Sequence, residues 1–370
     1  MDVSHRVHSS FNSTSPALCL LLPPVLQDRD EHGTAARPPV RARHDGDVSS
    51  PPRVPARAAL ALTAPWAGFA AVRALGAERG FPLVPALSFT PHAALSAVVP
   101  LTAALLSRSR SATALAAGSA VVLGAAVLTR ARPSAPVATA DGPALRVVSL
   151  NTLHGRADAA TVVSLVAEHD ADVVALMEVT PEGVTALLDA GIADLLPHGH
   201  VMPAGPDQPP GSGGAVWTRL EVLARSMVPG RFGQPSVRLT VPGALDVELT
   251  AVHTHPPLQG PARVADWEQD LRDLPTPGDD VLRVLTGDFN ATPDHASFRR
   301  LLRIGWVDAA RATGAGLRST WAPIRGGRPR LVLDHVLVDG RITPQWLQVV
   351  HVPGSDHRAL VTALRLPALR

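Results

Sequence analysis

Apolar side chains follow two different patterns along the 370 residues of the chain. In the first pattern, three nearly uninterrupted apolar stretches follow one another at residues 58–75, 81–106 and 111–128. Each approaches the ~20 residues that cross a bilayer as a helix, and none shows the polar face of period 3.6 that a soluble surface helix needs. We therefore predict a membrane region of about three helices over residues 56–130, with a soluble bundle of alanine-rich helices as the alternative.

The second pattern starts after a Pro/Ala-rich linker at residues 131–143. Short apolar runs typical of strands alternate there with a few amphipathic segments typical of helices. The predicted strands cover 145–151, 171–178, 213–219, 221–228, 246–255, 281–290, 330–338, 342–352 and 357–366. The predicted helices cover 157–169, 181–191, 261–273 and 295–303. Many strands with few helices between them predict an α/β (α+β) sandwich of mixed sheets over residues 144–370, covered by helices, and not a pure Rossmann arrangement.

Residues 1–55 follow neither pattern. They mix Ser, Pro, His, Arg and Asp around one apolar run at 17–26. That run is too short to span a bilayer, and a Pro pair interrupts it. We predict a disordered tail. A signal-peptide core is the alternative, although neither a close basic flank nor a convincing cleavage site accompanies it.

Composition narrows the classes of function. Hydrophobic residues make up 46% of the chain, which is high for a soluble enzyme of this length and favours a membrane region. The chain has no Lys and no Tyr, and its net charge is only +2, so it gives weak evidence for a nucleic-acid partner. The single cysteine, Cys19, lies outside residues 144–370 and excludes a disulfide framework or a Cys-based zinc site there.

Arginines flank the apolar stretches, and their distribution predicts an orientation. One group precedes the first stretch and fills the second hinge: Arg37, Arg41, Arg43, Arg53, Arg57, Arg108 and Arg110. With three spans these positions share one side, which the positive-inside rule makes cytoplasmic. A smaller group opposes this orientation: Arg73, Arg79, Arg130 and Arg132. We predict a multi-pass membrane protein whose C-terminal domain lies outside the cytoplasm.

Polar and acidic residues occur where the predicted strands end or begin. They are Asn151, Glu178, His253, Asp288, Asn290, Asp334, Asp356 and His357. A carboxylate, amide or imidazole at a strand end is held rigidly and exposed at the sheet rim, which suits a catalytic group. Any one of them alone is more often a turn residue or a helix cap. Their combination and order carry the argument.

Taken in order, the segments around these residues resemble the endonuclease/exonuclease/phosphatase superfamily. The matching segments are SLNTLHG, ALMEVT, GGAVWTR, AVHTHPP, LTGDFNATPDH, STWAP, LDHVLV and GSDHRALV. The resemblance covers about 145–367, and GDFN and SDHRALV are its most specific parts. It implies a four-layer sandwich of the deoxyribonuclease I-like type and a metal-dependent phosphodiesterase, phosphatase or nuclease.

The resemblance also implies a role for each residue. Glu178 would ligate a divalent metal, with Asn151 beside it and Asp356 near a possible second metal position. Asp288 and Asn290 would orient the attacking water and the scissile phosphate. His357 would contact the phosphate, and Asp334 would fix the tautomer of the His357 imidazole. His253 would add another donor to the phosphate oxygens.

Elementary chemistry agrees with these roles. Hydrolysis of a phosphodiester needs an activated water and stabilisation of charge on the non-bridging oxygens. Hard oxygen ligands such as Glu178 and Asp356 favour Mg²⁺, with Mn²⁺ or Ca²⁺ as alternatives. The general base is left open between Asp288 and His357. The substrate is left open between a phospholipid, a small phosphoester and a nucleic acid, and no protein partner is predicted.

Several residues next to the candidate site residues are expected to have structural roles. We expect His154, His295 and His335 to be structural histidines, and Asp294 to cap the helix that starts near His295. Trp321 either lines the site or packs in the core.

Two other classes of function fit the sequence less well. The calcineurin-like di-metal phosphoesterases need an early Asp-x-His and a GNH-type element, and neither occurs in the right order. A catalytically inactive, membrane-tethered binding module would be expected to lack Glu178, Asp288 or His357, and all three are present.

Overall fold

The computed structural model describes residues 54–134, 139–324 and 327–369. The predicted tail at 1–55 therefore lies almost wholly outside the described residues, as does the middle of the predicted linker. The helices are α1 (Ala56–Leu75), α2 (Leu83–Ala86), α3 (Thr90–Ser96), α4 (Val98–Ser107), α5 (Arg110–Leu128), α6 (Ala159–Glu168), α7 (Pro181–Asp189), α8 (Ile192–Leu195), α9 (Pro261–Asp273), α10 (Ala296–Arg303) and α11 (Ala309–Ala312).

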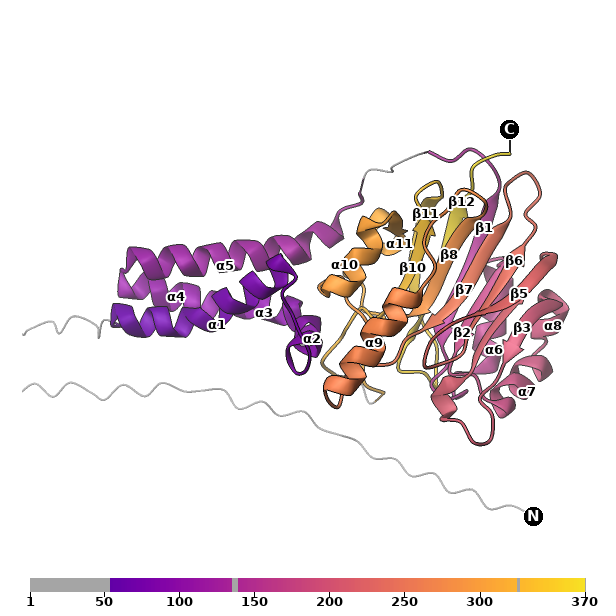
Figure 1. Cartoon of the computed structure of the whole chain (residues 1–370), viewed down its shortest axis with the longest axis horizontal. Coiled ribbons are helices and arrows are strands. Elements are labelled where there is room, and N and C mark those ends of the chain that lie inside the picture. Colours follow the sequence, from indigo (N-terminus) through magenta and orange to yellow (C-terminus); the bar gives the residue numbers. More distant parts are fainter. Residues whose placement is uncertain (1–53, 135–138, 325–326, 370) are drawn as a thin grey trace, which may run out of the picture. The chain divides into compact units, whose positions relative to one another are not determined.

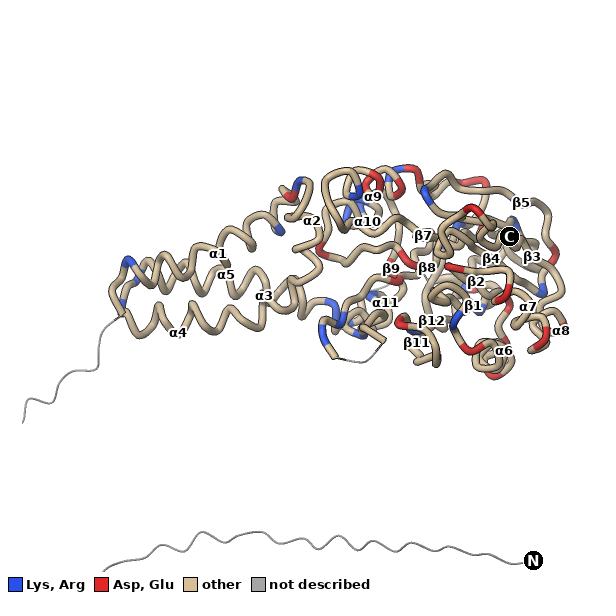
Figure 2. Tube along the Cα trace, turned by 90° about the horizontal axis from the view of Figure 1, so that it is seen from below, with Lys and Arg blue, Asp and Glu red and all other residues tan. Residues whose placement is uncertain are grey.

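Two of the apolar helices are long enough to cross a membrane by length and composition. They are α1, with 20 residues, and α5, which continues to Ala131 for 22 residues. The predicted middle span is bent by 44° between Leu83–Ser96 and Val98–Ser107, and counts as a third candidate only if the bent pair is one span. Pro100 explains the bend, because its ring displaces the carbonyl of the residue four positions earlier. Figure 2 shows that charged residues occur at the ends of these helices and not along them.

The strands form two mixed sheets of six strands each. They are β1 (Ala144–Asn151), β2 (Val173–Met177), β3 (His198–Met202), β4 (Gly214–Thr218), β5 (Val222–Val228), β6 (Gln234–Leu239), β7 (Val247–His253), β8 (Leu282–Asp288), β9 (Trp306–Asp308), β10 (Asp334–Asp339), β11 (Thr343–His351) and β12 (Arg358–Arg365). The first sheet has the order β11-β12-β1-β2-β4-β3, and the second has the order β5-β6-β7-β8-β10-β9. Each sheet contains one parallel pair, β1–β2 or β7–β8, among antiparallel neighbours.

The sheets pack face to face and carry helices on their outer faces (Figure 1). Val147 of β1 and Val284 of β8 belong to the core between the sheets. The opposite face of the first sheet packs against α6, α7 and α8, and the opposite face of the second sheet packs against α9 and α10. Strands buried on both faces read as continuous apolar runs, which is why β1 and β8 were visible in the sequence.

All nine predicted strands and all four predicted helices of this domain occur in the structure, with shifted ends. The strand predicted at 330–338 begins only at Asp334, because Leu331 bridges Trp321 instead of continuing the sheet. Three strands were not predicted: β3, β6 and β9. In β6 the buried positions include Gln234 and Ser236, so its sequence lacks the apolar run by which the other strands were recognised.

The apolar helices meet the sheet domain at a buried ionic cluster. Oδ1 of Asp294 accepts from Arg73 of α1, at 3.1 Å, and from Arg130 just beyond α5. The Glu78 carboxylate accepts from the backbone N–H of Ala296 at the start of α10. The prediction that Asp294 caps this helix is therefore wrong, because the residue before α10 makes no capping bond and Asp294 instead balances two arginines.

Candidate active site

The predicted site residues gather at one end of both sheets. In the first sheet, β1 ends at Asn151 and β2 is followed by Glu178. In the second sheet, His253 and Asp288 are the last residues of β7 and β8 and lie opposite each other in the parallel register. Because carboxyl ends of parallel strands meet at the same edge, four polar side chains from two sheets share this region.

Two further segments complete the group. Asp334 is the first residue of β10 and pairs with Asp288 across the antiparallel register. The turn before β12 supplies Asp356 and His357, and it is tied to β1 because Ser355 Oγ donates to the carbonyl of Asn151 at 2.7 Å. The same hydroxyl accepts from the backbone N–H of His357 at 3.0 Å.

These side chains surround a cleft of about 420 Å³. Its lining consists of Leu153, His154, Glu178, Pro209, Pro210, Gly211, Phe232, His253, Pro256, Asp288, Asn290, Trp321, Asp356 and His357. Asn151 and Asp334 lie behind this lining and bind its members. All eight predicted residues thus surround one cleft, while their catalytic and metal-binding roles stay predictions.

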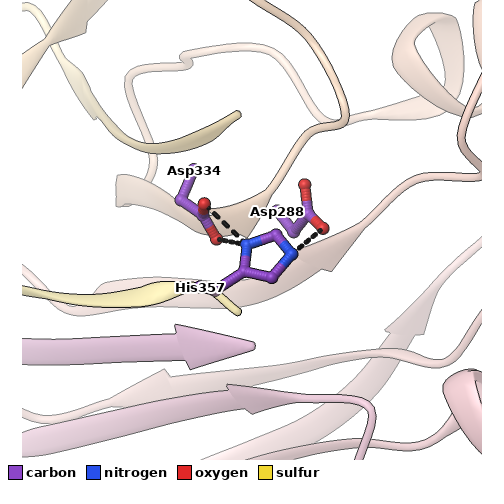
Figure 3. Close-up of side chains that lie close together, drawn as sticks. All are labelled: Asp288, Asp334 and His357. Carbon is purple, nitrogen blue, oxygen red and sulfur yellow. Dashed lines mark hydrogen bonds and ion pairs between the residues drawn. The ribbon is translucent and has the colours of Figure 1, made fainter. Parts of the chain in front are cut away.

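His357 lies between two carboxylates (Figure 3). Its Nδ1 is 2.9 Å from Asp334 Oδ2, and its Nε2 is 3.6 Å from Asp288 Oδ2. Burial alone would lower the pKa of His357, but the charges of Asp334 and Asp288 and the hydrogen bond to Asp334 outweigh it and raise this pKa to about 10. The ring is therefore cationic at neutral pH. Burial raises the pKa of Asp288 to about 7, although the His357 cation opposes the shift.

The opposite wall of the cleft is organised by Glu178. Asn151 Nδ2 donates to Glu178 Oε1 at 2.9 Å and to Asp288 Oδ2 at 3.1 Å, which holds the two carboxylates together. The amide oxygen of Asn151 accepts from the backbone N–H of Leu153, so in this arrangement the amide presents its donor to the acidic groups. His154 also reaches Glu178, with Nε2 at 3.0 Å from Oε2. Sequence analysis treated His154 as structural, and the structure places it in the cleft.

Asp356 carries an unsatisfied oxygen. Its Oδ2 accepts from the indole N–H of Trp321 at 2.9 Å, which settles the position of Trp321 in the cleft wall. Its Oδ1 is buried and has no hydrogen-bond partner within the described residues. The His357 imidazole is its charged neighbour, with Nε2 at 3.9 Å, beyond hydrogen-bond distance. A buried carboxylate oxygen without a donor is costly, so this atom can accept a further donor or a cation.

One group of the described residues has the spacing to hold a divalent cation, and the predicted ligands Glu178 and Asp356 line the same cleft. Asp288, Asp334 and His357 offer ligand atoms that all lie within 4.8 Å of one another. A metal on His357 would have to displace a ring proton that the raised pKa retains. Glu178 and Asp356 offer oxygen donors on the open cleft without that penalty. The oxygen-rich donor set fits Mg²⁺, Mn²⁺ or Ca²⁺, since four carboxylates face a single histidine cation.

His253 has a different character from His357. Burial lowers the pKa of His253 to about 4, so its ring is neutral at physiological pH. The ring stacks on Phe232 with 4.5 Å between centroids, and its backbone N–H donates to Gln234 Oε1. Nε2 lies 3.7 Å from Glu178 Oε1. A neutral imidazole held this way can donate one hydrogen bond but adds no charge.

Unusual backbone conformations concentrate around the cleft. Four non-glycine residues of the cleft have positive φ angles, between 45° and 58°: Leu153, His154, Glu178 and Asn290. Such conformations persist in non-glycine residues where surrounding bonds hold them. For Asn290 those bonds run from its N–H to Asp288 Oδ1 and from its Nδ2 to the carbonyl of Thr254. The strain indicates a preorganised site.

Two positioning hydroxyls were missed by sequence analysis. Besides Ser355, Thr320 Oγ1 accepts from the backbone N–H groups of both Leu333 and Asp334. No local sequence signal marks such hydroxyls, because their partners are distant along the chain. The structural expectation for His295 and His335 agrees with their positions: both are fully buried, with hydrogen bonds to backbone carbonyls.

Comparison with known proteins identifies the family. A model of the Endonuclease/Exonuclease/phosphatase family matches residues 148–357, which is more than half of the chain. The chain belongs to this family. No curated protein matches it.

Solved structures are similar to the sheet domain. An endonuclease/exonuclease/phosphatase from Beutenbergia cavernae DSM 12333 is 21% identical, with a TM-score of 0.50, over 60% of this chain and 72% of that chain. Humanized D. rerio TDP2 is 16% identical over 60% and 98% of the two chains, with a TM-score of 0.46. A family protein from Leptotrichia buccalis C-1013-b is also 16% identical, over 60% and 99%, with a TM-score of 0.46. The first of these confirms the deoxyribonuclease I-like sandwich.

Proposed function

We propose that this domain hydrolyses phosphoester bonds, chiefly phosphodiesters, with the help of a divalent cation, Mg²⁺ in the first instance. The observation that carries the proposal is the His357 cation held between Asp334 and Asp288 in a cleft whose other wall is the Glu178 carboxylate. Members of the family to which the chain belongs are typically metal-dependent phosphoesterases or nucleases.

Glu178 and Asp356 would hold the cation, and Asn151 would position Glu178. The chemistry that a divalent cation supplies at such a site is compensation of charge on the phosphoryl oxygens and activation of water. The N–H of the neutral His253 is available as a further donor to those oxygens.

The remaining steps belong to the protein's own groups. His357, fixed by Asp334, would bind a phosphoryl oxygen through Nε2 and stabilise the added negative charge. Because His357 is already protonated at neutral pH, it is a poor proton acceptor. Asp288, with a pKa near 7, is matched to accept the proton of the attacking water. Asn290 would orient that water or the phosphate.

The cleft favours a compact phosphoester. Among the described residues that line it there is no arginine, and the walls include Leu153, Phe232 and Trp321. A long nucleic acid needs several cations along its path. We propose a phospholipid headgroup or another small phosphoester as substrate, near the surface of a membrane that α1 and α5 would cross.

The structure also bears on the proposed orientation. Arg73 and Arg130, two of the four residues that oppose it, lie against the sheet domain, where both pair with Asp294. Arg57, Arg108 and Arg110 flank the opposite ends of α1 and α5. The group of arginines that favours this orientation has seven members and the opposing group has four, which supports a cytoplasmic location for the end remote from the sheets and an extracytoplasmic catalytic domain.

The test uses the full chain in neutral detergent with bis(p-nitrophenyl) phosphate and Mg²⁺, Mn²⁺ or Ca²⁺. We expect turnover that EDTA abolishes, and losses of at least about 100-fold in Asp288→Asn and His357→Gln. His351→Gln, an exposed histidine outside the cleft, is the matched control and retains activity. A folded protein without turnover on any phosphoester class would instead indicate an inactive binding module.

Substrate class needs a separate comparison. The full chain is incubated with phospholipid vesicles and, in parallel, with supercoiled plasmid. Release of phosphorylated headgroups without nicking is the expected result. Preferential nicking of the plasmid would overturn the lipid assignment while leaving phosphoester hydrolysis intact.

A further inference from the structure

A second polar cavity lies away from the catalytic cleft, where α1 and α5 end against the sheet domain. Its volume is about 70 Å³, enough for roughly five water-sized spheres, and a phosphate group has five heavy atoms. Four arginines line it: Arg73, Arg130, Arg299 and Arg311. Asp308 is the one acidic residue among the described residues of the lining.

The arginines are only partly neutralised. Arg73 and Arg130 share a single oxygen of the fully buried Asp294. Arg299 donates to two backbone carbonyls, those of Asp294 and Arg73, and to no carboxylate of the described residues. Burial and then the charge of Arg73 lower the pKa of Arg299, although the charges of Glu78 and Asp294 oppose the shift.

Arg311 adds to the positive charge of the cavity, and Asp308 offsets only part of that charge. The exposed guanidinium of Arg311 makes no hydrogen bond or ion pair with the described part of the chain. Asp308 Oδ1 accepts from the backbone N–H of Ala310, and its Oδ2 lies 3.6 Å from His335 Nδ1. Even with Asp294 and Asp308 both counted, two carboxylates face four arginines, so the cavity keeps an excess of positive charge.

We infer that this cavity binds a phosphate group, either as the headgroup of an anionic lipid or as a free phosphate. Guanidinium groups are suited to phosphate because their donors form a planar fork. The location supports the inference independently of charge, since the cavity lies at the ends of both apolar helices long enough to cross a membrane. A lipid phosphate would lie at this level if α1 and α5 span the bilayer. The inference does not depend on catalysis in the cleft.

The experiment uses two probes on the full chain in neutral detergent: inorganic phosphate, followed by thermal unfolding, and phosphatidylglycerol, followed by native mass spectrometry. Both are done in EDTA and in a His357→Gln background, so that binding in the catalytic cleft does not contribute. Arg311→Gln is the test variant, because Arg311 takes no part in the Asp294 cluster and its loss should not affect folding. Arg303→Gln, an exposed arginine of α10 outside the cavity, is the matched control.

We expect saturable binding of one phosphate-bearing probe, weakened about tenfold or more in Arg311→Gln and unchanged in Arg303→Gln. Binding of phosphatidylglycerol alone identifies a lipid headgroup site, and binding of inorganic phosphate alone identifies a soluble anion. The inference is overturned if neither probe binds, or if the two variants lose affinity equally.

Discussion

Replacing Asp334 by Asn should change how the stability of the protein depends on pH. In the folded protein the pKa of His357 is raised to about 10, whereas an unfolded histidine titrates near 6.5. A group whose pKa is raised by folding stabilises the fold fully below the unfolded value, and this contribution is lost as pH rises towards the folded value. The window for His357 is therefore pH 6.5 to about 10.

The size of the effect follows from the shift. Within that window the free energy of unfolding should fall by about 1.4 kcal/mol per pH unit, or about 3 kcal/mol between pH 7.5 and 10. The raised pKa of Asp288 acts at lower pH, because its value is about 7. The chain has no Lys and no Tyr, so beyond Cys19 and the α-amino group few side chains obscure the measurement in this range.

The assay is urea unfolding of the full chain in neutral detergent with EDTA, at pH values from 7.5 to 10. Wild type should lose stability along this range, and Asp334→Asn should show a much flatter dependence because the strongest partner of His357 is neutral. Asp339→Asn is the matched control, since Asp339 is the buried last residue of the same strand and pairs with Arg341. Equal pH slopes in wild type and Asp334→Asn would refute the assignment of a His357 cation stabilised by Asp334.

Three other predictions concern the frame around the site. Gly287→Ala should destabilise the folded protein by about 4 kcal/mol or more, measured as a large drop in melting temperature. The reason is that φ of Gly287 is +142° and an added Cβ would lie 2.2 Å from a β7 carbonyl oxygen. An unchanged melting temperature would contradict this prediction. Asp294→Asn should lower the free energy of unfolding in urea by about 3 kcal/mol, because it leaves two arginines without a carboxylate. The triple variant Asp294→Leu, Arg73→Met and Arg130→Met should recover most of that loss. Burial lowers the pKa of His295, so stability should fall as pH drops below about 6.5, and His295→Gln should remove part of that acid slope.

The sheets were largely predictable because burial on both faces leaves an unmistakable apolar run. The site was predictable for the same reason: Asn151, Glu178 and Asp288 interrupt such runs at the strand ends. Where a strand buries polar side chains, as β6 does at Gln234, its sequence has no apolar run by which the strand can be predicted. The break near Pro100 was present in the sequence but was outweighed by the apolar length of the stretch.

Contacts between distant segments account for the rest. Asp294 precedes a helix and is of a residue type that often caps helices. Its carboxylate instead accepts from two arginines of the apolar region, which lie more than 160 residues earlier in the chain. Ser355 acts on Asn151 across 204 residues. His154 looked like an ordinary loop histidine because only the fold shows that Glu178 lies beside it. Such pairings depend on the arrangement of strands and not on local residue patterns.

The place of β12 has a consequence for biosynthesis. This strand lies inside the first sheet, between β11 and β1, although it comes more than 200 residues after β1 and more than 180 residues after β2. While the ribosome is still making the middle of the domain, β1 has an open edge and the cleft lacks Asp356 and His357. The cleft is therefore incomplete until residue 365 has emerged. During translation the exposed edge of β1 needs protection from wrong pairing.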